Sequence, residues 1–315
     1  MDFAGKLAVV TGGGTGMGRE LVVQLAGAGA SVATCDVNGE TLAETKNRAE
    51  AAAPAGVRVT THICDVADEA DMLKFRDEVM AQHDTDHVNL VFNNAGIAGG
   101  GSFITGDRAE WEKTFAVDWG GVYNGCRAFV PLLVASDEGY LINTSSVNGF
   151  WASLGPGIAH TAYCTAKFAV KGFTEALLED FRINAPHVKA AVVMPGHIGT
   201  DIVINTRRVH GGDSEAMSAE ELVQLRADLT RRGMPIDGVS DDDLRKMMVM
   251  MGEMFRDNAP TTAAAAAATI LDGVREGKWR ILVGDDAHQL DKAVRADPEA
   301  AYGPEGLSLQ SIFGQ

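Results

Sequence analysis

A glycine-rich loop near the N-terminus is the feature that most restricts how this chain can fold. The loop, Thr11-Gly-Gly-Gly-Thr-Gly-Met-Gly18, follows the apolar run 7–10 and precedes a helical pattern near 16–28. Glycines allow a sharp backbone turn and the close approach of a pyrophosphate, and the start of the helix supplies amide donors. This order of strand, glycine turn and helix favours a dinucleotide site over a turn that serves packing alone.

The loop opens a long alternation of strand and helix patterns. Strands are predicted at 7–10, 31–35, 57–63, 88–92, 139–144, 188–194 and 279–283. Helices are predicted near 16–28, 39–53, 68–83, 161–184 and 262–276. Such alternation predicts a parallel sheet with helices on both faces. We therefore expect an α/β fold, a Rossmann-type doubly wound sheet of about seven strands, in a single domain over residues 1–315.

Two segments depart from this alternation. Residues 201–260 have no strand pattern and are predicted to form a helical insertion. Within it, Ser240 followed by three aspartates is typical of a helix N-terminus. Residues 285–315 form a C-terminal extension, helical to about 297, which we expect at the surface or at a subunit contact.

Charge and cysteine content exclude several kinds of partner. The net charge of −16 argues against binding to nucleic acid or to an anionic membrane. The four cysteines have neither CxxC nor metal-ligand spacing, so we expect buried thiols in a reducing compartment and no metal site. The first residues lack a signal-peptide pattern, and no apolar run approaches the roughly 18 residues of a membrane span. A cytoplasmic protein is expected.

Polar residues at strand ends extend the predicted nucleotide site. Asp36 ends the second strand, where a carboxylate can accept both ribose hydroxyls of an adenosine and would repel a 2′-phosphate. Neither Thr15 nor Val37 supplies a basic group for that phosphate, so NAD is favoured over NADP. Asp65-Val66 and Asn93-Asn-Ala-Gly96 follow the third and fourth strands and should open onto the same crevice.

The segment Tyr163-Cys-Thr-Ala-Lys167 carries a candidate acid/base pair. Residues four apart lie on one face of a helix, so a phenol and an ammonium would be neighbours. A nearby positive charge favours phenolate and lowers a tyrosine pKa, which makes Tyr163 a candidate general acid/base. The alternative is that Tyr163 packs and Lys167 is solvated.

With these motifs in order, the chain resembles the short-chain dehydrogenase/reductase family over roughly residues 4–200 and 261–284. Two further motifs, Asn143-Thr-Ser-Ser-Val-Asn-Gly149 and Pro195-Gly-His-Ile-Gly-Thr200, complete the resemblance. It implies that Tyr163 is the catalytic acid/base and that Lys167 binds the nicotinamide ribose and lowers the Tyr163 pKa. It also implies that Ser146, rather than Ser145, binds the substrate oxygen.

The resemblance further implies an NAD site and an activity. The implied cofactor-binding residues are Gly12, Thr15, Gly16, Met17, Gly18, Asp36, Asp65, Val66, Asn93, Ala95, Gly96, Tyr163, Lys167, Pro195, Gly196, Ile198 and Thr200. The implied activity is hydride transfer between NAD(H) and a secondary alcohol or ketone, in a homotetramer or homodimer. The alternative is a non-catalytic NAD-binding regulator or scaffold, which would be expected to lose Tyr163 or Lys167.

One position departs from the family pattern. The family usually carries an asparagine in the helix before the fifth strand, where it supports a water-mediated proton relay to the lysine; this chain has Asp118. The main-chain carbonyl could still serve that relay. A carboxylate would also stabilise Lys167 as ammonium if close, and could take part itself. The alternative is that Asp118 only satisfies local backbone groups.

The substrate is predicted to be bulky and hydrophobic, of steroid, terpenoid or aryl type. Phe150 and Trp151 lie in a lengthened loop between Ser146 and Tyr163 and are expected to wall the cleft, although they could merely pack the loop. Ile202 and the methionines of 247–251 lie in the 201–260 insertion, a candidate substrate lid. That insertion also holds two candidate partners for a substrate carboxylate, Arg207 and Arg208. We expect His160 and His197 to be local hydrogen-bonding groups.

Overall fold

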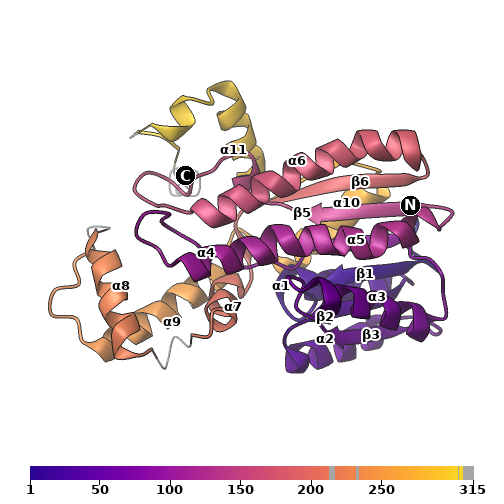
Figure 1. Ribbon diagram of the computed structural model, residues 1–315, viewed down its shortest axis with the longest axis horizontal. Helices are drawn as coiled ribbons and strands as arrows, with labels where there is room; N and C mark the ends of the chain where they lie inside the picture. The colour runs from indigo at the N-terminus through magenta and orange to yellow at the C-terminus, as the bar shows by residue number, and fades with distance from the viewer. Residues whose placement is uncertain (213–216, 232–233, 304, 308–315) are drawn as a thin grey trace.

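Seven parallel strands form the centre of the protein. The computed structural model describes residues 1–315 apart from 213–216, 232–233, 304 and 308–315 (Figure 1). The strand order is β3-β2-β1-β4-β5-β6-β9. Their bounds are β1 Leu7–Thr11, β2 Ser31–Asp36, β3 Val59–Ile63, β4 Leu90–Asn93, β5 Gly139–Thr144, β6 Val188–Pro195 and β9 Arg280–Val283. The predicted seven-stranded, doubly wound sheet is confirmed.

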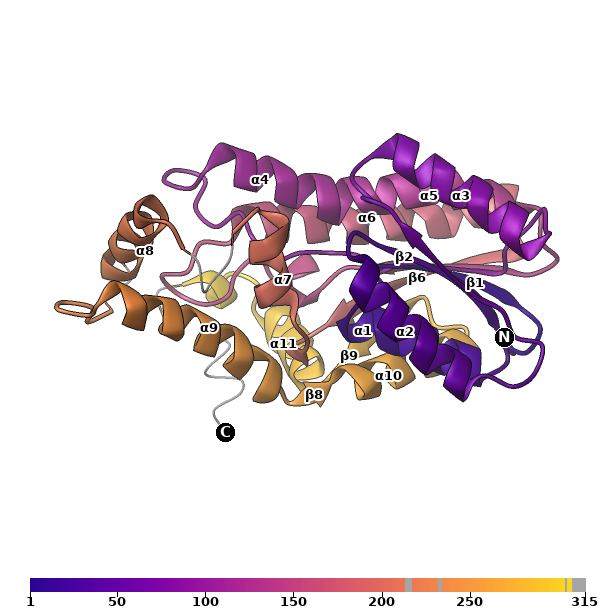
Figure 2. The same cartoon turned by 90° about the horizontal axis from the view of Figure 1, so that it is seen from below.

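Helices cover both faces of the sheet, as Figure 2 shows. One face packs on α1 (Gly16–Gly27), α2 (Gly39–Ala52) and α10 (Ala263–Arg275), and the other on α3 (Glu69–His83), α5 (Gly121–Val134) and α6 (Thr161–Asn184). All five residues of β1 are buried, because a parallel strand between two helical layers has no solvent face. The apolar runs in the sequence therefore reflect burial on both sides.

Element boundaries differ from the predictions by one or two residues. The third strand begins at Val59 and the fourth at Leu90, each two residues later than predicted, and the sixth extends to Pro195. The predicted helix at 161–184 is observed as α6 with those bounds. A further helix, α4 (Arg108–Phe115), runs into α5 through a π-helical turn, Ala116–Gly120.

The described residues of the 201–260 segment are mainly helical, as predicted, and lie to one side of the sheet (Figures 1 and 2). The segment contains α7 (Ile202–Val209), α8 (Ala219–Arg231) and α9 (Asp241–Asp257). Ser240 caps α9 by accepting a hydrogen bond from the Asp243 amide at 3.1 Å. The helices α8 and α9 share a small apolar core, which includes Leu222 and Leu244 and against which Met247 and Met248 pack.

The C-terminal extension covers the loop that follows β5. Its described residues include α11 (Asp285–Ala296) and a 3₁₀ turn, Ala300–Tyr302. Trp151 is 0% exposed beneath it, and its indole nitrogen donates to the Ala301 carbonyl at 3.1 Å. The prediction that Trp151 walls the substrate cleft is therefore wrong, because an indole without accessible surface cannot line a cleft. Phe150 packs, half-buried, against the same cluster.

The four cysteines are free and buried, as their spacing predicts. Among the described residues, no helix is both long and apolar enough to cross a membrane.

Candidate active site

The glycine loop at the end of β1 takes a conformation that only small residues allow. Gly12 and Gly16 have positive φ angles of 68° and 54°. A Cβ atom on Gly12 would lie 2.7 Å from the Cα of Ala95, and one on Gly18 would lie 2.0 Å from the Gly12 carbonyl oxygen. The loop therefore packs tightly against the residues that follow β4, and the Gly13 amide donates to the Cys35 carbonyl at the end of β2 at 3.0 Å.

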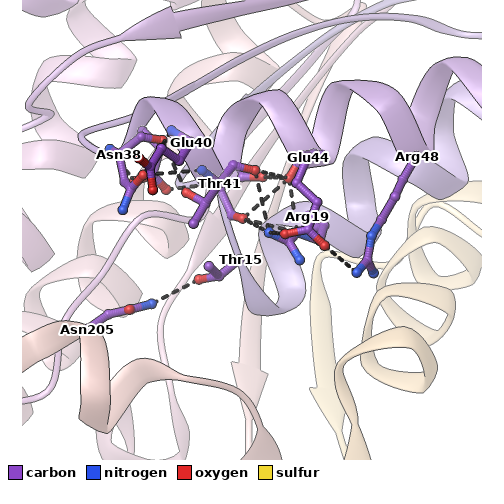
Figure 3. Close-up of polar contacts among 12 residues, drawn as sticks. Thr15, Arg19, Asn38, Glu40, Thr41, Glu44, Arg48 and Asn205 are labelled. Atoms are coloured by element: carbon purple, nitrogen blue, oxygen red, sulfur yellow. Dashed lines mark hydrogen bonds and ion pairs between the residues drawn. The ribbon is translucent and has the colours of Figure 1, made fainter.

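Arg19 links this loop to α2 (Figure 3). Its guanidinium donates to the Gly14 carbonyl at 2.6 Å and to the Thr45 hydroxyl at 3.0 Å, and it forms an ion pair with Glu44 at 3.0 Å. Glu44 also pairs with Arg48. Arg19 is thus committed to the loop scaffold and is not free to bind a ligand phosphate.

Asp36 lies where the resemblance requires it, at the carboxyl end of β2. Its carboxylate accepts from the Gly14 amide at 3.0 Å and from the Asn38 amide at 3.1 Å. Asn38 in turn caps α2 by accepting from two amides of its first turn. These contacts fix the carboxylate at the mouth of the glycine loop.

A cavity of about 700 Å³ runs along this edge of the sheet. Twelve of the predicted residues line it, namely Gly12, Thr15, Gly16, Met17, Gly18, Asp36, Asp65, Val66, Ala95, Gly96, Thr200 and Ile202. Asn94 of the predicted Asn93–Gly96 motif also lines it, and so does Arg208, the candidate partner for a substrate carboxylate. Asn38, Lys113 and Asn205 were not predicted from the sequence and line it too. Asn205 shares the helical spacing of Ile202, a signal that could have found it.

Other predicted residues lie outside this cavity. Pro195 is buried at the end of β6, Ile198 is buried at the start of the short strand β7 (Ile198–Gly199), and Gly196 lies between them. Asn93 is also buried: its amide nitrogen donates to Asn143 at 2.8 Å and to the Cys126 sulfur at 3.4 Å. The Asn93 side chain therefore does not face the cavity, and its place beside the cofactor stays a prediction. As the last residue of β4 it points into the core, and Asn94 lines the cavity instead.

Ser146, Tyr163 and Lys167 meet where β5 ends and α6 begins. Lys167 Nζ lies 5.3 Å from the centre of the Tyr163 ring, one helical turn away. A hydrogen bond with Ser146 acts to lower the pKa of Tyr163. Ser145 has a different place: its hydroxyl donates to the Lys167 carbonyl at 2.7 Å, a bond that holds the helix. Ser145 is thus committed to the helix, whereas Ser146 is the serine that acts on the pKa of Tyr163.

Lys167 forms a buried ion pair with Asp118. Lys167 Nζ lies 3.0 Å from Asp118 Oδ1, and the two side chains are 3% and 0% exposed. Lys167 also donates to the Thr144 carbonyl at 3.3 Å, and the Ile97 amide donates to Asp118 Oδ1 at 3.3 Å. Asp118 Oδ2 is buried without a hydrogen-bond partner among the described residues.

Two backbone features make room for this pair. Asp118 lies in the π-helical turn between α4 and α5, and such turns occur frequently at functional sites. A Cβ atom on Gly96 would lie 2.6 Å from Asp118 Oδ1 and 3.2 Å from Lys167 Nζ. Only a glycine at position 96 leaves the ion pair undisturbed.

The pKa directions in this cluster follow from burial and charge. Burial raises the pKa of Asp118, and Lys167 opposes the rise. For Lys167, burial acts to lower the pKa, but Asp118 and Tyr163 more than compensate, so the pKa is raised. Burial raises the pKa of Tyr163; Lys167 lowers it, and Asp118 adds to the rise. The predicted effect of Lys167 on Tyr163 is present but outweighed.

Two histidines lie near these motifs. The His160 ring stacks on Tyr163 with centroids 4.8 Å apart, and burial lowers its pKa to about 4. The His197 ring interacts with the Phe255 carbonyl at 2.7 Å, and its amide donates to Asp286 at 2.6 Å. Asp286 is buried at the start of α11, so the extension holds the loop that carries Gly196.

Comparison with known proteins agrees with this geometry. Residues 6–210 match the family model of short chain dehydrogenases. SadH of Mycobacterium tuberculosis, a protein named as an oxidoreductase, is 34% identical over 93% of this chain and 91% of its own length. Levodione reductase of Leifsonia aquatica is 30% identical over 71% of this chain and 80% of its own length.

Solved structures give the same result. A short-chain dehydrogenase/reductase from Burkholderia phymatum in complex with NAD has a TM-score of 0.77 and 26% identity, over 98% of this chain and 100% of its own. A metagenomic short-chain oxidoreductase in complex with NADP has a TM-score of 0.55 and 30% identity, over 62% of this chain and 84% of its own. Fold and site thus define an oxidoreductase that binds a nicotinamide cofactor. The chain belongs to the short-chain dehydrogenase/reductase family.

Proposed function

We propose that this protein is an NAD(H)-dependent alcohol dehydrogenase or ketone reductase in which Tyr163 is the general acid/base. The observation that carries the proposal is the cluster of Ser146, Tyr163 and Lys167 at the carboxyl edge of the sheet, beyond the end of the glycine-loop cavity. A phenol beside a serine hydroxyl and a buried ammonium is suited to moving a proton to or from an alcohol oxygen.

Each residue of the cluster has a distinct task. Ser146 would hold the substrate oxygen, which orients it for reaction. Tyr163 would accept the hydroxyl proton during oxidation and return it during reduction. Lys167 favours the phenolate form and would bind the nicotinamide ribose. The bound nicotinamide supplies or accepts the hydride. Asp118 would keep Lys167 protonated inside the protein, and its unpartnered oxygen is available to a proton relay.

We propose NAD rather than NADP as the cofactor. The adenosine end of the cavity presents the carboxylates of Asp36 and Glu40, which would repel a 2′-phosphate. The nearest basic residue on the loop, Arg19, is already bound to Gly14 and Glu44. Since relatives bound to either cofactor have been solved, this choice rests on the local charges of this chain.

A bulky hydrophobic alcohol or ketone is the proposed substrate, with the 201–260 segment as its lid. The loop after β4 exposes Phe103 and Ile104, which are 77% and 91% accessible, and it is bound to Thr161 at the start of α6. Two relatives are named for retinol and levodione, and neither name indicates a sugar. Ile202 adds an apolar side chain to the cavity wall.

We further propose a homotetramer or homodimer located in the cytoplasm. The outer surfaces of α5 and α6 expose Tyr123, Phe168 and Ile183, side chains that subunit contact would bury. The buried free thiols suit a reducing compartment. Light scattering on the purified protein tests the assembly, and a monodisperse monomer would exclude it.

The test of the catalytic proposal is Tyr163→Phe. This variant should fold and bind NAD but lose nearly all turnover with a panel of bulky alcohols, followed by absorbance of the reduced nicotinamide. Substantial residual turnover would exclude Tyr163 as the acid/base. A wild-type protein that binds NAD without oxidising or reducing any member of the panel would favour the alternative, a non-catalytic regulator or scaffold.

A further inference from the structure

The helix α7 contacts the glycine loop directly, although residues 15 and 205 are far apart in the sequence. The Asn205 side-chain amide donates to the Thr15 hydroxyl at 3.0 Å, as Figure 3 shows. A Cβ atom on Gly16 would lie 3.0 Å from the Thr200 side chain. The start of α7 therefore lies against the N-terminus of α1, the part of the loop that receives a pyrophosphate.

A second contact fixes α7 in this place. The Thr206 hydroxyl accepts a hydrogen bond from the Ala98 amide at 2.7 Å, which joins the helix to the loop after β4. An ion pair between Asp201 and Arg256, at 3.1 Å, joins the N-cap residue of α7 to α9. The helix is thus held at both sides of the cavity, and the position of its side chains is well defined.

Arg208 lies one turn beyond Asn205 on the same face of α7. Side chains three residues apart on a helix are neighbours, and the axial rise between them is about 4.5 Å. Ile202, Asn205 and Arg208 all line the cavity. Among the described residues, Arg208 has no hydrogen bond or ion pair, and its side chain is exposed.

Among the described residues that line this cavity, no carboxylate forms an ion pair with Arg208. Asp36, Glu40 and Asp65 contribute carboxylates to the lining. The other lining cation, Lys113, is bound to Asp65 at 2.7 Å. A dinucleotide brings two negative charges in its pyrophosphate, which the glycine loop meets with backbone amides alone.

We propose that Arg208 binds the pyrophosphate of the dinucleotide, so that α7 forms the second half of the phosphate site and closes over the cofactor. Asn205 sets the position, because its bond to Thr15 fixes the helix against the glycine loop. The inference rests on the proposed NAD binding. It adds that the 201–260 segment, proposed as a substrate lid, also contributes directly to cofactor affinity.

Two other partners for Arg208 are less well supported. A 2′-phosphate would have to lie beside Asp36, whose carboxylate is fixed by two backbone amides and would repel it. A substrate carboxylate would bind near Tyr163, which lines neither of the two cavities that Arg208 borders.

The neighbouring arginine provides a matched control. Arg207 pairs with Glu221 at 3.2 Å and lines a second cavity, between α7, α8 and α9, which Arg208 also borders; unlike Arg208, it does not line the glycine-loop cavity. Arg207→Gln and Arg208→Gln remove the same charge from consecutive residues, so a difference between them reports position and not net charge.

The experiment is calorimetric titration of wild type, Arg208→Gln and Arg207→Gln with NAD, NADP, ADP and adenosine. Arg208→Gln should raise the Kd for NAD and for ADP by roughly tenfold or more and should leave the Kd for adenosine unchanged, because adenosine has no phosphate. Its Kd for NAD should also depend less on salt than that of wild type. Arg207→Gln should match wild type for all four ligands.

Each other outcome has a definite meaning. Equal losses in the two variants, or an unchanged Kd for NAD in Arg208→Gln, would overturn the proposal. A loss confined to NADP would assign Arg208 to the 2′-phosphate and also overturn it. A loss for adenosine as well would indicate a disturbed helix, to be checked by the melting temperature, and would count against a phosphate contact. A wild-type protein that binds none of the four ligands would instead refute the proposed function.

Discussion

Lys167 Nζ lies 3.0 Å from Asp118 Oδ1, and neither side chain reaches solvent to any important extent. An asparagine at position 118 would leave the ammonium charge of Lys167 free to act on Tyr163. With a carboxylate there, the pair is close to neutral as seen from the phenol, and the phenolate gains less stabilisation. The pKa of Tyr163 is therefore raised, chiefly by burial and further by Asp118, although an ammonium is its neighbour.

Asp118→Asn should move the acid limb of the pH profile to lower pH. The carboxylate of Asp118 raises the pKa of Tyr163, so its removal should lower that pKa and let phenolate form in more acidic solution. The expected shift in kcat/KM for alcohol oxidation is about one pH unit. An exposed aspartate on the same helix as Tyr163, changed in Asp180→Asn, serves as the control.

Two results would contradict this account of Asp118. An unchanged profile would exclude any active proton role for the carboxylate. A shift to higher pH would mean that Lys167 loses its proton once its buried partner is gone, in which case Asp118 serves chiefly to keep the lysine charged.

Gly96→Ala should impair catalysis without a change in backbone conformation. Gly96 does not have a positive φ angle, so alanine is tolerated there by the backbone itself. The added methyl group would lie 2.6 Å from Asp118 Oδ1 and must displace the ion pair. We expect kcat to fall on the order of tenfold, since small displacements of positioning groups are costly.

Gly120→Ala is the matched control, because a Cβ atom there has no neighbour within 4 Å although the residue ends the same π-helical turn. Steady-state kinetics on both variants is the measurement. Equal kcat values would mean that the cluster around Lys167 tolerates a shift of the pair.

Asp36→Asn should reduce the preference for NAD over NADP. The amide keeps the shape of the carboxylate and an oxygen that can accept from the Gly14 amide, but it loses the charge that repels a 2′-phosphate. We expect the ratio of the two dissociation constants to fall roughly tenfold, mainly because NADP binds better. Fluorescence titration with both cofactors measures this ratio. A ratio that stays constant would assign the selectivity to another residue, with Glu40 as the first to test.

Trp151→Ala should lower stability and not substrate affinity. Removal of a fully buried indole and its bond to Ala301 should cost about 3–5 kcal/mol in the free energy of unfolding. Trp279→Ala, which removes a half-exposed indole, should cost much less. Urea denaturation monitored by circular dichroism gives both values. A Trp151→Ala protein that keeps its stability but has a raised KM for substrate would indicate that Trp151 does line the substrate cleft.

The fold could be predicted from the sequence because local signals agreed with one another. The apolar strands, the glycine turn and the Ser240 cap each indicated the element that is observed. Most residues at the strand ends also line the predicted cavity, because the carboxyl ends of parallel strands share an edge.

Side-chain direction was the part that sequence could not supply. Asn93 and Asn94 are identical in type, and only the pleat of β4 decides that the first points into the core and the second into the cavity. Trp151 is covered by residues about 150 positions later, a contact without any local signal. The pKa of Tyr163 likewise depends on Asp118, which the turn between α4 and α5 brings beside Lys167.

The C-terminal extension limits how segments can be exchanged between this protein and its relatives in a chimera. The match to the family model ends at residue 210, but α11 lies well beyond that boundary. Through Asp286 it holds the backbone next to Gly196, and together with the 3₁₀ turn it covers Trp151 in the loop that leaves Ser146. A chimera that takes its catalytic half from this protein and its last thirty or so residues from another would therefore lose the support of both loops. Transplantation of the active site must carry residues 284–302 with it.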